Sequence, residues 1–261
     1  MNKKKFRPSN IYLIIVFILL YLPIAYLIFY SFNSGADMNS FKGFSLVHYG
    51  GVFEDKRLWD IVLNTLIIAL LSSLLATVIG TLGAISIYYM RSKELRKRTL
   101  TVNNILMVMP DVMIGASFLV LFTYLLPLPM GFRTVLISHV AFSIPIVVLM
   151  VLPRLNSMNK SMLLAAEDLG ASDLQILNKI ILPNSASGVL AGFFMALTYS
   201  LDDFAVTFFV TGSGFSTLSV EIYSRVRTGV SLEINALSTL MFIVSLFLVL
   251  GYYAIENREG K

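Results

Sequence analysis

Three acidic residues stand inside long apolar stretches of the sequence. Asp111 follows a proline in the segment MPDVMIG, and Asp202 and Asp203 are adjacent in YSLDDFAVTFF. Ionisable side chains are costly in a membrane and are usually retained there for function. No Lys or Arg lies in these two stretches, so an ionised carboxylate there needs another partner, either a proton or a cationic solute. The three acids are therefore candidate residues of a pathway for a cation.

The three acids could also be satisfied without any solute. Neighbouring helices can supply Ser, Thr or Asn side chains that hydrogen-bond the carboxyl groups, or the carboxyl groups can stay protonated. Adjacent helical residues point about 100° apart, so Asp202 and Asp203 cannot form a carboxylate pair with each other. A protease site would need Asp111 close to one of them on a facing helix. His139, in another apolar stretch, is more often a satisfied helix contact than a ligand.

The composition places these residues in a polytopic membrane protein. Of the 261 residues, 57% are hydrophobic and 13% are charged, which is about half the charged share of an average soluble domain. Cysteine is absent, which excludes disulfides and thiolate metal sites. We expect an all-α fold, a single membrane domain over residues 1–261, with no metal and no cofactor. Six stretches are long enough to cross the bilayer as helices, near 11–32, 61–88, 103–126, 132–152, 185–211 and 234–255.

The basic residues predict how the spans are oriented. With both termini in the cytoplasm, 14 of the 20 Lys and Arg residues fall in inside segments and 6 in outside segments, as the positive-inside rule requires. The first span is too long for a signal-peptide core and has no clear cleavage site, so we interpret it as an uncleaved anchor. The basic charge therefore reflects cytoplasmic loops and not nucleic-acid binding.

Small residues recur at every fourth position in two of the predicted spans. One ridge lies in the second span and one in the fifth: Ser72, Ala76, Gly80 and Ala84, and Gly188, Gly192, Ala196 and Ser200. Such ridges let helix backbones approach closely where lipid supplies no hydrophobic driving force. Packing within this chain and an interface with a second membrane subunit both explain them.

One inside loop, residues 153–184, is long enough to hold structure of its own. A helix is predicted over 160–169, capped at its start by Asn159. Gly170 supplies the left-handed conformation that ends such a helix. A second helix is predicted to follow at once and to bury one apolar face. The loop is therefore expected to form a compact helical hairpin.

The second helix of this hairpin has a start signal and an expected end. Ser172 and Gln175 form a capping box. Leu174, Leu177 and Ile181 form its predicted apolar face. Pro183 is predicted to mark a change of direction into the fifth span. The exposed small residues early in the hairpin suit insertion into a groove of a partner.

The hairpin closely resembles a loop known from one family. An alanine pair, a glycine, an isoleucine and a terminal Leu-Pro carry the resemblance, here Ala165, Ala166, Gly170, Ile180, Leu182 and Pro183. With the six spans, this spacing resembles the EAA loop of ABC importer permeases. The resemblance implies a MetI-like, type I importer fold, in which this loop is a coupling helix that docks on an ATPase subunit. Leu164 stands where that family has its first Glu, and Glu167 is the candidate substitute.

Further segments resemble one branch of that family. YSLDDF, MPDVMIG, GFSLVHYGGVF and the NTL at 64–66 are similar to the second permease subunit of spermidine/putrescine importers. The similarity covers nearly the whole chain and implies polyamine uptake, with Asp111, Asp202 and Asp203 in the substrate pathway and Ser200 and Thr207 assisting. Polyamines are flexible polycations, which suits a pathway that carries carboxylates.

The resemblance also implies partners and a location. We expect a heterodimer with a second permease subunit, two copies of an ABC ATPase and an extracytoplasmic polyamine-binding protein, in the lipid bilayer of a bacterial inner membrane. No G-x-x-x-x-G-K-[ST] motif occurs, so this chain is expected to be non-catalytic, with ATP hydrolysed by another polypeptide. The alternatives are an ion- or proton-coupled secondary transporter of a cation, which predicts an inverted repeat that the sequence does not reveal, or an intramembrane aspartyl protease.

Overall fold

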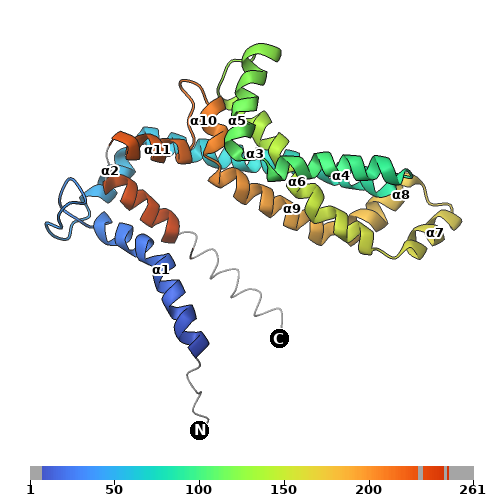
Figure 1. Ribbon diagram of the computed structural model, residues 1–261, viewed down its shortest axis with the longest axis horizontal. Helices are drawn as coiled ribbons and strands as arrows, with labels where there is room; N and C mark the ends of the chain where they lie inside the picture. Colours follow the sequence, from blue (N-terminus) through green and yellow to red (C-terminus); the bar gives the residue numbers. More distant parts are fainter. Residues whose placement is uncertain (1–7, 229–231, 244–245, 247–261) are drawn as a thin grey trace, which may run out of the picture. The chain divides into compact units, whose positions relative to one another are not determined.

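The computed structural model describes residues 8–228, 232–243 and 246, and these are almost entirely helical (Figure 1). Within that part of the chain, the one extended pairing is an isolated antiparallel bridge between Asn33 and Phe44. The chain divides into two compact units, residues 1–59 with 222–261, and residues 60–221. The candidate site lies entirely in the second unit.

The first unit contains the N-terminal span. Its helices are α1 (Pro8–Ser31), α2 (Val47–Glu54) and the apolar segment Leu232–Ile243. Helix α1 is long and apolar enough to cross a membrane, as the sequence predicts. Of the predicted sixth span, 234–255, residues 244–245 and 247–255 lie outside the described residues.

A small ionic cluster joins the ends of three segments in this first unit. The guanidinium of Arg225, in helix α11 (Leu218–Thr228), lies 3.1 Å from Asp55 Oδ2 and 3.4 Å from Glu233 Oε2. The N–H of Leu58 also donates to the Asp55 carboxylate, at 3.0 Å. Burial opposes ionisation of Asp55, but the Leu58 N–H and the Arg225 charge outweigh it and hold the pKa of this carboxyl below its usual value.

The second unit is built around one buried helix, α6 (Phe132–Ser157). Helix α9 (Leu182–Asp202) packs along its length, and α4 (Lys93–Val108) and α3 (Lys56–Tyr89) also contact it (Figure 1). Among the described residues, four helices are individually long and apolar enough to span a membrane, and the bent pair formed by α4 and α5 (Asp111–Val120) makes a fifth.

Both ridges of small residues pack against α6. A Cβ added at Gly80 of α3 would lie 2.7 Å from Val147 Cβ. One added at Gly188 of α9 would lie 2.8 Å from the Met150 carbonyl oxygen. Real Cβ atoms do not approach other atoms this closely, so only glycine fits at both places. Of the two origins that the sequence allowed, packing within this chain accounts for the ridges.

The third predicted span, 103–126, is broken, which corrects the expectation of one continuous helix. Helix α4 ends at Val108, and the chain bends by 103° before the segment Asp111–Leu125, whose last turn is the π-helical η1 (Leu121–Leu125). The cause is Pro110. Proline has no N–H to continue the helix and forces the residue before it into an extended conformation, and Met109 has φ −67° and ψ 139°.

The fifth predicted span, 185–211, is also interrupted. Helical structure runs without a large bend over residues 173–202 and resumes in α10 (Ala205–Val210). Between them Asp203 has the extended values φ −64° and ψ 121°. The sequence interpretation placed Asp203 within a continuous helix, and the structure shows that it lies at a break instead.

Pro183 does not change the direction of the chain, contrary to the prediction. It occupies the start of α9, directly after the π-helical turn η2 (Leu177–Ile181). In this wider turn the N–H of Leu182 bonds to the carbonyl of Leu177, five residues back. A helix that is locally widened can pass a proline without the clash that ends an ordinary α-helix.

Candidate functional site

The candidate acids lie where the two broken spans are interrupted. Asp111 is the first residue of α5, and Asp202 and Asp203 stand at the end of α9. The first turn of a helix has backbone N–H groups without helical partners, and these attract negative charge. The helix breaks therefore offer hydrogen-bond donors to carboxylates that have no Lys or Arg nearby in the sequence.

Asp203 uses these donors to cap α10. Its Oδ1 accepts a hydrogen bond from the N–H of Val206 at 3.2 Å. Its Oδ2 accepts from both the N–H and the hydroxyl of Thr207, each at 2.8 Å. The side chain of Asp203 is only 6% exposed. The chain itself therefore satisfies this carboxylate, for which the sequence alone identified no partner.

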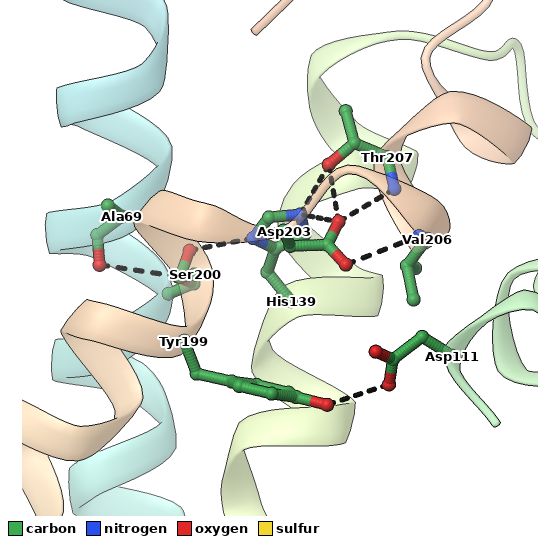
Figure 2. Close-up of polar contacts among 9 residues, drawn as sticks. Ala69, Asp111, His139, Tyr199, Ser200, Asp203, Val206 and Thr207 are labelled. Atoms are coloured by element: carbon green, nitrogen blue, oxygen red, sulfur yellow. Dashed lines mark hydrogen bonds and ion pairs between the residues drawn. The ribbon is translucent and has the colours of Figure 1, made fainter. Parts of the chain in front are cut away.

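A fully buried histidine completes the network (Figure 2). His139 Nε2 lies 2.8 Å from Thr207 Oγ1 and 3.4 Å from Asp203 Oδ2. His139 Nδ1 lies 2.6 Å from the hydroxyl of Ser200. Ser200 in turn is 3.0 Å from the hydroxyl of Ser72 on α3. The expectation that His139 is a satisfied helix contact is confirmed, and its partners come from α9, the break and α10.

A second polar contact lies on a more exposed surface. The hydroxyl of Tyr199 donates to Asp111 Oδ1 at 2.7 Å, joining α9 to the start of α5 (Figure 2). Tyr199 is 39% exposed, and Asp111 is exposed as well. The Tyr199 ring packs edge-on against Phe142, with 5.1 Å between centroids. This pair presents a carboxylate and an aromatic ring at an accessible place.

The structure thus divides the five predicted pathway residues into two groups. Ser200, Asp203 and Thr207 come together in the buried network. Asp111 and Asp202 stay exposed. Asp203, with hydrogen-bond donors on both oxygens, is not arranged to share a proton with another acid, as a protease dyad would require.

Sequence reasoning missed Tyr199 and gave His139 no part in the site. Tyr199 opens the segment YSLDDF, which was singled out for its acids alone. No local pattern links His139 to residues 61 and 68 positions away, Ser200 and Thr207. The one available signal was that a polar residue in an apolar span needs partners on its neighbours.

The helical hairpin forms at the other end of α6, largely as predicted. Helix α7 (Lys160–Asp168) begins with the Asn159 side chain accepting from the N–H of Ser161. It ends at Gly170, which has φ +78°. The N–H groups of Gly170 and Ala171 donate to the carbonyls of Glu167 and Ala166, the paired bonds of a glycine-terminated helix.

The second helix of the hairpin, α8 (Asp173–Ile176), has the predicted capping box. The hydroxyl of Ser172 accepts from the N–H of Gln175, and the Gln175 side chain accepts from the N–H of Ser172. The predicted apolar face is confirmed for Ile181, which is buried, and for Leu177, which packs against the same core. It is wrong for Leu174, which is 69% exposed, while Ile176 is buried instead. Leu174 and Ile176 both lie in α8, and Leu177 and Ile181 lie in the π-helical turn that follows it.

The candidate coupling residues of this hairpin have different exposures. Ala165, Glu167, Gly170 and Pro183 are exposed, and Ala166, Ile180 and Leu182 are partly buried. Leu163 and Ile176 anchor the hairpin in the same core cluster as Val151 and Leu155 of α6. Leu164 and Leu169 point outward, with 60% and 87% exposed. The hairpin is therefore fixed to the bundle on one side and presents small and apolar residues on the other.

Comparison with known proteins agrees with this description. Residues 76–258 match the family described as binding-protein-dependent transport system inner membrane component. The spermidine/putrescine transport system permease protein PotC of Haemophilus influenzae is 38% identical, over 98% of this chain and 99% of that protein. The putrescine transport system permease protein PotI of Escherichia coli is 33% identical, over 95% of this chain and 91% of that protein.

A solved structure shows the same fold. A subunit of a bacterial ABC transporter involved in the import of the acidic polysaccharide alginate superposes with a TM-score of 0.76. The superposition covers 97% of this chain and 95% of that subunit, and the two sequences are 18% identical. The predicted type I ABC importer permease fold is confirmed.

The fold and the helical hairpin define a membrane permease subunit of an ABC importer, which is a transport protein and not a catalytic enzyme. The chain belongs to the family of inner membrane components of binding-protein-dependent transport systems. It therefore resides in the bacterial inner membrane and works with the partner proteins of an ABC transporter. The secondary transporter and the protease are not favoured.

Proposed function

We propose that this chain forms one half of the translocation pathway of an ATP-driven importer of polyamines such as spermidine and putrescine. The observation that carries the proposal is the exposed pair of Asp111 and Tyr199, with the exposed Asp202 at the end of α9. A carboxylate attracts an ammonium group by charge, and a tyrosine ring adds attraction to a cation over its face. The similar permeases PotC and PotI are described as polyamine transport proteins.

The complex that we propose has a second permease subunit as the other half of the pathway. Two copies of an ABC ATPase bind on the cytoplasmic side, and an external binding protein delivers the solute. Both termini of this chain lie in the cytoplasm. Exposed carboxylates on this chain would then face the pathway between the two permease subunits, where the bilayer does not have to accommodate their charge.

The hairpin of α7 and α8 is the proposed docking site of the ATPase. Closure of the two ATPase subunits on ATP would move the hairpin as a lever. Because α6 and α9 flank the hairpin in the chain and pack along each other, they would follow the hairpin as one body. The pathway then opens to the outside, and hydrolysis of ATP resets the permease pair to its starting conformation.

Uptake by the purified complex in liposomes tests this function. Initial uptake of radiolabelled spermidine is measured with ATP inside the vesicles and the binding protein outside. The expected result is uptake that requires ATP and continues when an ionophore removes ion gradients. Uptake that follows an ion gradient without ATP would instead support the secondary transporter. A neutral solute of similar length serves as the control and is expected to stay outside.

A further inference from the structure

The donor and acceptor roles of the groups around His139 can be assigned without conflict. An ionised Asp203 only accepts hydrogen bonds, and the hydroxyl of Thr207 donates its single hydrogen to it. Thr207 Oγ1 can therefore only accept from His139, so His139 Nε2 carries a hydrogen. His139 Nδ1 then faces the hydroxyl of Ser200. The polar side chains of this network are thus bonded to one another inside the bundle.

Two sets of contacts link His139 to Tyr199. Along the chain, Tyr199 directly precedes Ser200, whose hydroxyl lies 2.6 Å from His139 Nδ1. Through space, the Phe142 ring lies 4.9 Å from the His139 ring and 5.1 Å from the Tyr199 ring, measured between centroids. The histidine therefore constrains both the backbone and the ring of Tyr199.

A further set of contacts links His139 to Asp111 through helices α10 and α5. His139 holds α10 through Thr207, and α10 packs closely on α5. A Cβ added at Gly115 of α5 would lie 2.7 Å from the Phe209 ring and 3.0 Å from the Val206 Cα, so the two helices are in contact there. Asp111 is the first residue of α5. The position of its carboxylate thus depends on where the network holds α10.

We infer that His139 is a positioning residue, which holds Tyr199 and Asp111 in the arrangement that meets the solute. Ser200, Thr207 and Asp203 then influence transport through His139 and not by contact with the solute. This inference rests on the proposed function, because it takes the Tyr199–Asp111 pair as the place where the polycation binds. It separates two kinds of acid, Asp203 inside the network and Asp111 outside it.

Single substitutions of His139 provide the first test, in the complete complex reconstituted in liposomes with spermidine as the probe. His139→Leu removes both polar contacts, and we expect it to raise the apparent KM for uptake about tenfold, the size of coupling typical within one hydrogen-bond network. His139→Gln keeps a donor and an acceptor, and we expect its KM to stay within about threefold of wild type. His48→Leu, at the chain's other histidine, is the matched control and is expected to leave uptake unchanged.

A double-mutant cycle provides the second test and does not depend on whether His139→Leu assembles. It uses His139→Asn, whose side chain stays polar but is too short to reach both Ser200 and Thr207. In that background, Asp203→Asn is expected to change the KM at least about threefold less than in wild type. Asp202→Asn, at an exposed position outside the network, is expected to change the KM by the same factor in both backgrounds.

Two results would overturn the inference. One is a wild-type KM in assembled His139→Leu. The other is an Asp203→Asn effect that simply adds to that of His139→Asn, since it would mean that Asp203 meets the solute itself. Failure of the wild-type complex to take up spermidine with ATP is a different outcome and would count against the proposed function.

Discussion

Asp111 and Tyr199 are 88 positions apart in the chain and are joined by a hydrogen bond of 2.7 Å. One stands at the start of α5, after the proline break, and the other lies one turn before the break that ends α9. The contact thus links the two interruptions of the bundle. It also leaves the carboxylate exposed, with a neutral hydroxyl as its partner and its charge unbalanced within the pair.

Removing the charge of Asp111 is expected to weaken uptake of a polycation. Asp111→Asn should raise the apparent KM for spermidine about tenfold, since a hydrogen bond to a charged group contributes about 1.5–3 kcal/mol. Tyr199→Phe should have a smaller effect in the same direction. Tyr124→Phe, at an exposed tyrosine of η1, is the control. Initial-rate uptake by reconstituted complexes measures all three, and equal KM values would remove the pair from the pathway.

The two adjacent acids are expected to behave differently. Asp203→Asn should lower the stability of the protein by about 1–3 kcal/mol, because the cap of α10 and a buried acceptor are impaired. Asp202→Asn, at an exposed position, should leave stability within about 0.5 kcal/mol. Thermal unfolding of the purified complex, followed next to uptake, separates these effects. Equal losses of stability would contradict the difference in burial.

Gly170 is expected to control coupling between the ATPase and the bundle. Gly170→Pro should abolish ATP-dependent uptake and weaken ATPase binding while insertion into the membrane persists, because proline cannot adopt φ +78°. Gly170→Asn is the matched control, since Asn tolerates the left-handed conformation better than most residues. Co-purification of the ATPase and uptake are the measurements. Normal assembly and transport in the proline variant would show that the turn is not required.

A pair of glycine substitutions tests the packing that holds α5. Gly115→Ala should lower stability by about 1–3 kcal/mol, because the added methyl overlaps the Phe209 ring and the backbone of α10. Gly83→Ala should not, because its Cβ would meet only Val148 Cγ2 at an ordinary 3.8 Å. Both glycines lie in helices, so the difference reports packing and not helix propensity. Similar melting temperatures for the two variants would argue against close contact of α5 and α10.

The ionic cluster at Asp55 predicts a dependence of stability on pH. The folded-state pKa of Asp55 lies below its unfolded value, so the carboxylate stabilises the fold above about pH 4 and loses this effect as the pH falls through the folded pKa. Because both partners are partly exposed, the effect should stay under about 1 kcal/mol. Asp55→Asn should therefore melt slightly below wild type at pH 7 and converge with it in acid. A difference that persists at low pH would point to another cause.

The sequence by itself determined the class of the protein and the local structure of the hairpin. Long apolar stretches have to become helices in lipid, because no water is present to satisfy the backbone. The hairpin could be predicted almost residue by residue, since Asn159, Gly170 and the Ser172 capping box act on backbone groups within four positions of themselves. The predictions for the apolar side of Leu174 and for a change of direction at Pro183 were wrong.

The tertiary structure alone decided what the acids do. From the sequence, Asp111, Asp202 and Asp203 were all candidates for one cation pathway, and the different directions of Asp202 and Asp203 did not show which of them faces it. Folding places His139 beside Asp203 and Tyr199 beside Asp111, at separations of 64 and 88 positions, and leaves Asp202 outside both contacts. Burial and hydrogen-bond partners depend on which helices meet, and packing of small residues against α6 settles this. No pattern within a single helix carries that information.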